Sequence, residues 1–121
     1  MTAAVPRLAD YLQHMAEAAA QACAPVEGLN EDAFRAELRT QQAVVFNLIV
    51  LGEAATQVLG HFGDFAASQP GIPWRSMKGM RNRIAHGYFA IDLQVVWATV
   101  RNALPQLLAD LPAARAAAQR P

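Results

Sequence analysis

The sequence predicts an all-α fold, an up-and-down bundle of four main helices. Its 121 residues are 54% hydrophobic, which is enough apolar material for the core of one domain. Apolar residues recur at the three- and four-residue spacing of amphipathic helices, and no run of strand-like alternation of useful length interrupts them. We therefore expect a single helical domain over residues 1–121, with a core at about residues 5–112.

The first helix is expected at about residues 6–23. Pro6 suits its first turn, where the missing N–H of proline costs least. The segment 25–29, which contains proline and glycine, is expected to connect this helix to the next.

The second helix is expected to run from Asn30 to about His61. Asn30 is a favourable N-cap, and Glu31 and Asp32 place negative charge at the positive end of the helix dipole. No proline breaks the apolar periodicity that follows, so we expect one long helix in which Gly52 is a tolerated weak point.

A loop rich in glycine, serine and proline is expected between the second and third helices. The third helix should begin at Pro73 or Trp74 and end near Gly87, because glycine commonly follows the last residues of a helix.

The fourth helix is expected to begin at Leu93, with Asp92 as its N-cap. Pro105 lies in its interior and predicts a kink or local break, and Pro112 lies near its end. The tail from Ala113 onward is expected to fray.

Residues 81 to 88, Arg-Asn-Arg-Ile-Ala-His-Gly-Tyr, hold most of the candidate chemistry. Arg81 is always charged and can bind two phosphate oxygens at once. His86 is of the one residue type that ordinarily exchanges a proton near neutral pH. This pair suits the cleavage of a phosphate ester.

The charge of the whole chain gives no general attraction to nucleic acid, because ten basic and ten acidic residues cancel. The distribution is uneven, however, since no carboxylate lies between Asp64 and Asp92. The cations of this interval either contact an RNA backbone or form a solvated helix face. They are Arg75, Lys78, Arg81 and Arg83.

Several other classes of protein have little support. Cys23 is the only cysteine, which excludes an intrachain disulfide and favours the cytoplasm. The N-terminus lacks a secretion signal, and the most apolar stretch, residues 43–51, is too short to span a membrane. No histidine has a cysteine or carboxylate at the spacing of a metal site, so we expect no metal and no cofactor.

The spacing of Arg81, His86 and Tyr88 resembles the signature of HepT-type toxins, which are ribonucleases of the HEPN superfamily. The resemblance covers roughly residues 5–110. The flanking matches are Leu51-Gly52-Glu53-Ala54, Ile72-Pro73-Trp74-Arg75, Gly79-Met80, Phe89-Ala90-Ile91-Asp92 and Val96-Trp97.

This resemblance implies a HEPN-like homodimer in which the motifs of both subunits meet in a cleft. It also implies a metal-independent endoribonuclease that cleaves tRNA or mRNA by attack of the 2′-hydroxyl, leaves a 2′,3′-cyclic phosphate, and has neither DNA nor a membrane as a partner. In such systems the tyrosine at the position of Tyr88 accepts AMP groups from an MntA-type nucleotidyltransferase antitoxin. The chain would then be the toxin of a bacterial type VII-like toxin–antitoxin system.

Helix geometry constrains this site. Arg81 and His86 diverge by roughly 140° on one straight helix. Either the chain turns at Gly87 and brings the histidine inward, or a two-fold axis brings Arg81 of one chain near His86 of another. Asn82 shares a face with His86 and could hydrogen-bond either the imidazole or the substrate.

Three questions stay open at this point, each with two possible answers. Glu53 forms a structural salt bridge, or it orients Arg81 or Arg83. Tyr88 is a packing residue or the AMP acceptor. The whole chain is a nuclease, or an inactive HEPN-like dimer that binds a nucleotidyltransferase partner or a nucleotide.

Overall fold

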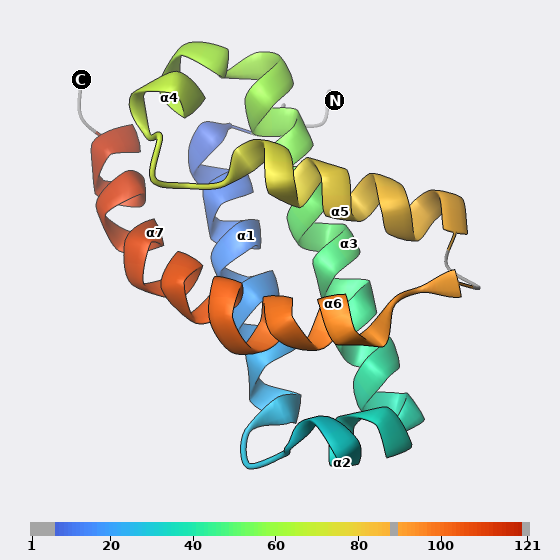
Figure 1. The fold of residues 1–121 in the computed structure, drawn as a ribbon. Coiled ribbons are helices and arrows are strands. Elements are labelled where there is room, and N and C mark those ends of the chain that lie inside the picture. The colour runs from blue at the N-terminus through green and yellow to red at the C-terminus, as the bar shows by residue number, and fades with distance from the viewer. Residues whose placement is uncertain (1–6, 88–89, 120–121) are drawn as a thin grey trace, which may run out of the picture.

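The computed structural model describes residues 7–87 and 90–119, and these form an all-α fold without strands (Figure 1). The predicted fold class is therefore confirmed. The elements are α1 (Leu8–Cys23), a 3-10 turn (Ala24–Val26), α2 (Glu31–Ala36), α3 (Leu38–His61), α4 (Gly63–Ser68), α5 (Trp74–Gly87), α6 (Leu93–Ala98), a π-helical turn (Thr99–Ala103) and α7 (Leu104–Ala118).

The central element is α3, which packs against α1 on one side and against α5 on the other. Figure 1 shows α5 crossing α3, while α6 and α7 form a continuous arm that ends alongside α1. Side chains from α1, α2, α3 and α7 meet in the core between these helices. The largest fully buried ones include Leu12, Met15, Phe34, Leu51 and Leu111.

By length and composition alone, α3 is apolar enough to cross a membrane. The apolar helix thus extends well beyond residues 43–51, the stretch expected to be too short to span a membrane. Its buried face, which includes Leu48, Leu51 and Val58, packs between α1 and α5. This is the environment of a core helix in a globular bundle.

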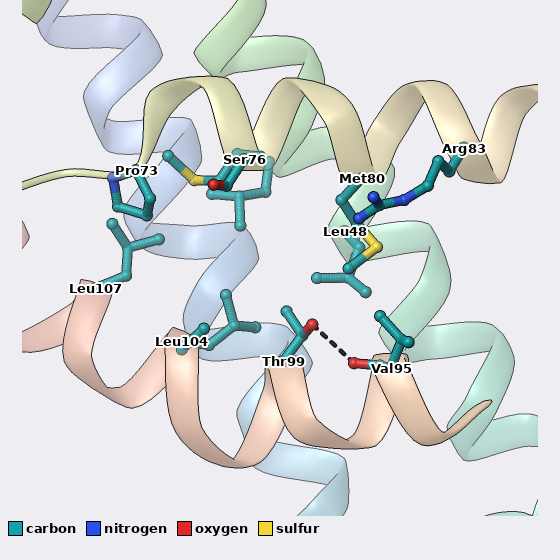
Figure 2. Close-up of a pocket in the computed structure, with 12 residues that line it drawn as sticks. Leu48, Pro73, Ser76, Met80, Arg83, Val95, Thr99, Leu104 and Leu107 are labelled. Atoms are coloured by element: carbon teal, nitrogen blue, oxygen red, sulfur yellow. Dashed lines mark hydrogen bonds between the residues drawn. The ribbon is translucent and has the colours of Figure 1, made fainter. Parts of the chain in front are cut away.

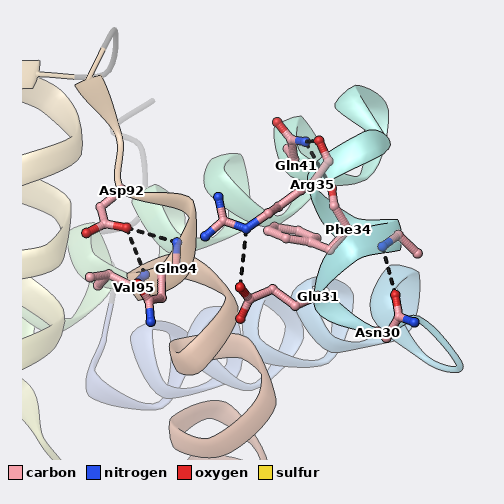
Figure 3. A network of polar contacts seen from close by, with 9 residues as sticks. Asn30, Glu31, Phe34, Arg35, Gln41, Asp92, Gln94 and Val95 are labelled. Carbon is pink, nitrogen blue, oxygen red and sulfur yellow. Dashed lines mark hydrogen bonds and ion pairs between the residues drawn. The ribbon is translucent and has the colours of Figure 1, made fainter.

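Both predicted N-caps are confirmed. Asn30 Oδ1 accepts a hydrogen bond from the N–H of Ala33 at 2.8 Å (Figure 3). Asp92 Oδ1 accepts from the N–H groups of Gln94, at 2.9 Å, and Val95, at 3.4 Å. These contacts satisfy donors that the first turn of a helix leaves without a backbone partner.

The predicted long second helix is wrong at Glu37, where an extended backbone (φ −116°, ψ 91°) separates α2 from α3. Gln41 Nε2 stabilises this break by donating to the carbonyls of Phe34 and Arg35, both at 2.9 Å (Figure 3). These carbonyls lie at the end of α2, where acceptors lack the i+4 donor of a continuing helix, and the Phe34 carbonyl also accepts from the N–H of Glu37 at 3.2 Å. With this break, the ring of the fully buried Phe34 packs beside the ring of Trp97, and the two ring centroids are 5.3 Å apart.

A short helix, α4, occupies part of the segment that we predicted to be a loop. The buried Trp74 explains the packing of this segment, since its indole Nε1 donates to the carbonyls of Ala66 and Gln69, both at 3.1 Å. A buried indole N–H requires such an acceptor, so the segment that contains Ala66 and Gln69 packs against Trp74 at the start of α5.

The predicted break near Pro105 takes the form of the π-helical turn, after which Pro105 lies in the first turn of α7. Proline has no backbone N–H to donate, and the first turn of a helix is where the loss of that donor costs least. The helix α7 continues past Ala113, where the expected frayed tail begins, as far as Ala118. Ala114 is fully buried and the helix packs against α1.

Phe34 should be a major contributor to the stability of this fold. We expect Phe34→Ala to lower the free energy of unfolding by roughly 3–5 kcal/mol, because it leaves a cavity beside Trp97. Val95→Ala, at a 42% exposed position, should change it by no more than about 0.5 kcal/mol. Urea unfolding followed by circular dichroism measures both. Equal effects of the two variants would contradict this account of the core.

Candidate active site

The helix α5 carries the three candidate catalytic residues, Arg81, Asn82 and His86. It runs unbroken to Gly87, as predicted, so His86 is still part of a regular helix. A turn at Gly87 therefore cannot bring His86 toward Arg81 within one protomer. Tyr88, the predicted AMP acceptor, lies outside the described residues.

The guanidinium of Arg81 is held against α3. Its Nη1 lies 3.4 Å from Glu53 Oε2, and its Nη2 donates to Thr56 Oγ1 at 3.2 Å. The side chain is only 25% exposed, and its Nε is buried without a hydrogen-bond partner in the described part of the chain. Glu53 thus forms a salt bridge, which was one of its two alternatives, and its partner is Arg81.

Gly52 makes this arrangement possible and is more than a tolerated weak point. A Cβ atom at Gly52 would lie 2.3 Å from Arg81 Cβ and 2.7 Å from the carbonyl oxygen of Met77. Only glycine lets α3 and α5 approach so closely. The stem of Arg81 rests on the backbone of α3 at this point.

Asn82 and His86 have fewer contacts. Asn82 is half-buried and His86 is exposed. Within residues 7–87 and 90–119 neither side chain makes a hydrogen bond, so Asn82 does not bind the imidazole in this protomer. The exposed imidazole of His86 is reachable from solvent.

The other predicted RNA-binding cations, Arg75, Lys78 and Arg83, are exposed. Arg83 borders an apolar groove of about 240 Å³ between α5 and the α6–α7 arm, and Figure 2 shows it at one end beside Met80. Arg81 instead contacts α3, so it and Arg83 have different neighbours.

An exposed apolar stripe lies on the same helix as the Arg81 contacts. Leu38 is 63% exposed and Phe46 64% exposed, and with Ile49 they line a groove of about 570 Å³ that Ala85 of α5 also borders. Phe46, Ile49 and Glu53 follow one another at intervals of three and four residues along one face of α3. The apolar surface therefore shares this face of α3 with Glu53, the ion-pair partner of Arg81.

Other reactive side chains do not join this site. Burial, reinforced by the nearby Glu27 carboxylate, raises the pKa of the Cys23 thiol, which disfavours a nucleophilic thiolate. His14 and His61 are exposed on α1 and α3. Among the described residues no cluster of three or more histidine, cysteine, aspartate or glutamate side chains could hold a metal ion.

Comparison with known protein families identifies the architecture. A family model described as "Ribonuclease HepT-like" matches residues 8–113, which include α5 and the segment of α3 beneath it. The chain belongs to the HepT-like ribonuclease family.

Individual relatives agree with this membership. The chain is 36% identical over 98 residues to "Probable ribonuclease HepT" of Thermococcus cleftensis, covering 81% of this chain and 86% of the relative. It is 32% identical over 80 residues to a "Putative RNase" of Methanocaldococcus jannaschii, covering 66% and 64%. A "Putative RNase" of Caldanaerobacter subterraneus is 26% identical over 97 residues, covering 80% and 84%. No solved structure matches significantly.

Membership of the HepT-like family confirms the resemblance drawn from residues 81–88 and the predicted enzyme class, a ribonuclease of the HEPN type. Sequence reasoning missed Thr56 and the role of Gly52. The available signal was the run Gly52-Glu53-Ala54-Ala55-Thr56, which places a small residue, a carboxylate and a hydroxyl on adjacent turns of one helix.

Gly52→Ala should disturb the α3–α5 contact. The added methyl group forces Arg81 or the α5 backbone to move, and we expect the free energy of unfolding to fall by roughly 1–3 kcal/mol. Gly60→Ala, on the same helix with nothing within 4 Å of the added Cβ, should be neutral or stabilising by up to about 1 kcal/mol. Chemical denaturation compares the two, and a Gly52 variant as stable as the Gly60 variant would refute the close approach.

Proposed function

We propose that this ribonuclease is the toxin of a bacterial type VII-like HepT/MntA toxin–antitoxin system, and that it is a metal-independent endoribonuclease with Arg81 and His86 at a dimer cleft. One observation carries this proposal. Arg81 and the exposed His86 lie on the same helix, α5, and the Arg81 guanidinium contacts Glu53 and Thr56 of α3. Arg81 can bind phosphate and His86 can transfer protons.

The proposed reaction uses the nucleophile that RNA itself supplies. His86 of one subunit accepts the proton of the 2′-hydroxyl, whose oxygen attacks the adjacent phosphorus. The bond from phosphorus to the 5′-oxygen breaks, and His86 of the second subunit protonates the departing oxygen. The products are a 2′,3′-cyclic phosphate and a 5′-hydroxyl, and the steps require no metal ion.

Arg81 would stabilise the negative charge that develops on the non-bridging oxygens. Each of its Nη atoms carries two N–H groups, and contact with Glu53 and Thr56 leaves donors on both for the phosphate. Asn82 would hydrogen-bond the substrate or an imidazole across the cleft. Arg75, Lys78 and Arg83 would contact the RNA backbone beyond the scissile bond, which gives affinity without base selection.

The dimer is part of the proposal because one protomer holds Arg81 and His86 apart. The exposed side chains of Leu38 and Phe46, beside the partly buried Ile49, support a second copy of this chain as the occupant of that face. Two-fold packing there would bury the stripe and bring two copies of the motif together, because Ala85 borders the same groove.

Inhibition is proposed to occur at Tyr88. An MntA-type nucleotidyltransferase would transfer AMP from ATP to the phenol oxygen, with release of pyrophosphate. Because Tyr88 follows His86 by two residues, the added phosphate would introduce negative charge close to the catalytic histidine and repel RNA. The alternative, an inactive dimer that only binds such a partner or a nucleotide, predicts no cleavage at all.

Cleavage of RNA in EDTA tests the reaction. We expect the protein to cut tRNA or mRNA in the presence of EDTA and to leave 2′,3′-cyclic phosphate ends. His86→Ala and Arg81→Ala should each lower the rate by at least about 100-fold, through loss of proton transfer and of charge stabilisation. Denaturing gels and mass spectrometry of the products provide the measurement. Equal, negligible cleavage by all three proteins would leave only the binding module.

The dimer face has its own test. Phe46→Glu should convert the dimer to monomers and reduce cleavage by at least about tenfold, because a charge would have to be buried in the interface. Val95→Glu, at another exposed apolar position, on α6, is the matched control and should stay dimeric and active. Light scattering coupled to size exclusion reports the mass. A Phe46→Glu dimer with full activity would eliminate this face as the interface.

A further inference from the structure

We infer that Thr56 is a positioning residue whose hydroxyl sets the orientation of the Arg81 guanidinium toward the scissile phosphate. This inference rests on the proposed function, because it assumes that Arg81 binds that phosphate. Thr56 lies on α3, is partly buried, and is 25 positions from Arg81 in the chain.

The hydrogen bonds of Thr56 have a fixed direction. Its hydroxyl donates to the carbonyl oxygen of Gly52, one turn earlier, at 2.7 Å. A threonine hydroxyl has a single proton, so Oγ1 can act only as an acceptor toward Arg81 Nη2, which lies 3.2 Å away. The backbone of α3 thus fixes the lone pair that receives the guanidinium.

Thr56 and Glu53 together hold both ends of the guanidinium. Their positions are three residues apart and so lie on one face of α3, and they contact Nη2 and Nη1 respectively. With the stem of Arg81 resting on Gly52, rotation of the guanidinium plane is restricted.

The two contacts differ in what they do to the charge. Glu53 is 52% exposed, so its ion pair is screened by solvent, and its carboxylate offsets part of the positive charge that a phosphate would experience. Thr56 is neutral and leaves the charge intact. It therefore orients Arg81 without weakening the attraction between the guanidinium and a phosphorane.

A donor held in the correct orientation stabilises the transition state most, because it does not have to reorganise as charge develops. Loss of the Thr56 hydroxyl should accordingly lower kcat and kcat/KM together and leave KM nearly unchanged. A purely structural role would instead lower the stability and the concentration of active enzyme, with no dependence on the hydroxyl itself.

The test compares Thr56→Val, which has nearly the same shape without the hydroxyl, with Thr56→Ser, which retains it. Cleavage of bulk tRNA, or of an mRNA transcript if tRNA is not cut, gives kcat and KM in EDTA. We expect Thr56→Val to lower kcat by about five- to tenfold, the effect of one lost hydrogen bond, with KM within about twofold. Thr56→Ser should retain at least about half of the original kcat.

Control measurements separate the possible outcomes. Thermal unfolding shows whether each variant is folded at the assay temperature, and Thr56→Ala provides a second hydroxyl-free variant that adds no methyl group to the packing. The inference is overturned if Thr56→Val and Thr56→Ala keep full kcat, if Thr56→Ser loses as much as they do, or if only KM changes. If Arg81→Ala is as active as the unaltered protein, or the unaltered protein cleaves neither RNA, the proposed function fails instead.

Discussion

The close approach of α3 and α5 at Gly52 is the constraint on which the site depends. It brings the stem of Arg81 onto the α3 backbone and places the guanidinium within reach of Glu53 and Thr56. The contact with α3 is the main tertiary support of α5, because a groove separates α5 from the α6–α7 arm. The direction in which α5 presents His86 is therefore set by this one helix crossing.

Sequence reasoning located the elements whose signals are local. The N-caps Asn30 and Asp92 and the end of α5 at Gly87 depend on residues within one turn of the boundary, and all three are where the sequence placed them. The break at Glu37 depends instead on Gln41 binding the end of the preceding helix and on burial of Phe34, and neither is visible in local propensity. In the same way α4 forms where Trp74 requires acceptors, so tertiary contacts override the loop-like composition.

The candidate site divides along the same line. Arg81 and His86 could be proposed from the sequence because their residue types carry recognisable chemistry, and helix periodicity alone predicts that they diverge. Thr56 is an ordinary residue on another helix, and its relation to Arg81 appears only when α3 and α5 are placed together. The sequence predicts a weak point at Gly52 because glycine lowers helix propensity. In the structure its lack of a side chain is what allows α3 and α5 to cross so closely.

The balance of charge supports the orienting role proposed for Thr56. The chain has no net charge, and the Arg81 guanidinium shares its nearest surroundings with the Glu53 carboxylate, so long-range attraction contributes little to holding a phosphate at the site. An enzyme with such a site gains more from placing a single guanidinium correctly than from adding cations. A donor in a fixed position stabilises the transition state, whereas added cations would strengthen the binding of every RNA. Dimerisation through the apolar face of α3 would serve the same end: it would add a second histidine and a second arginine at fixed positions without enlarging the positive surface.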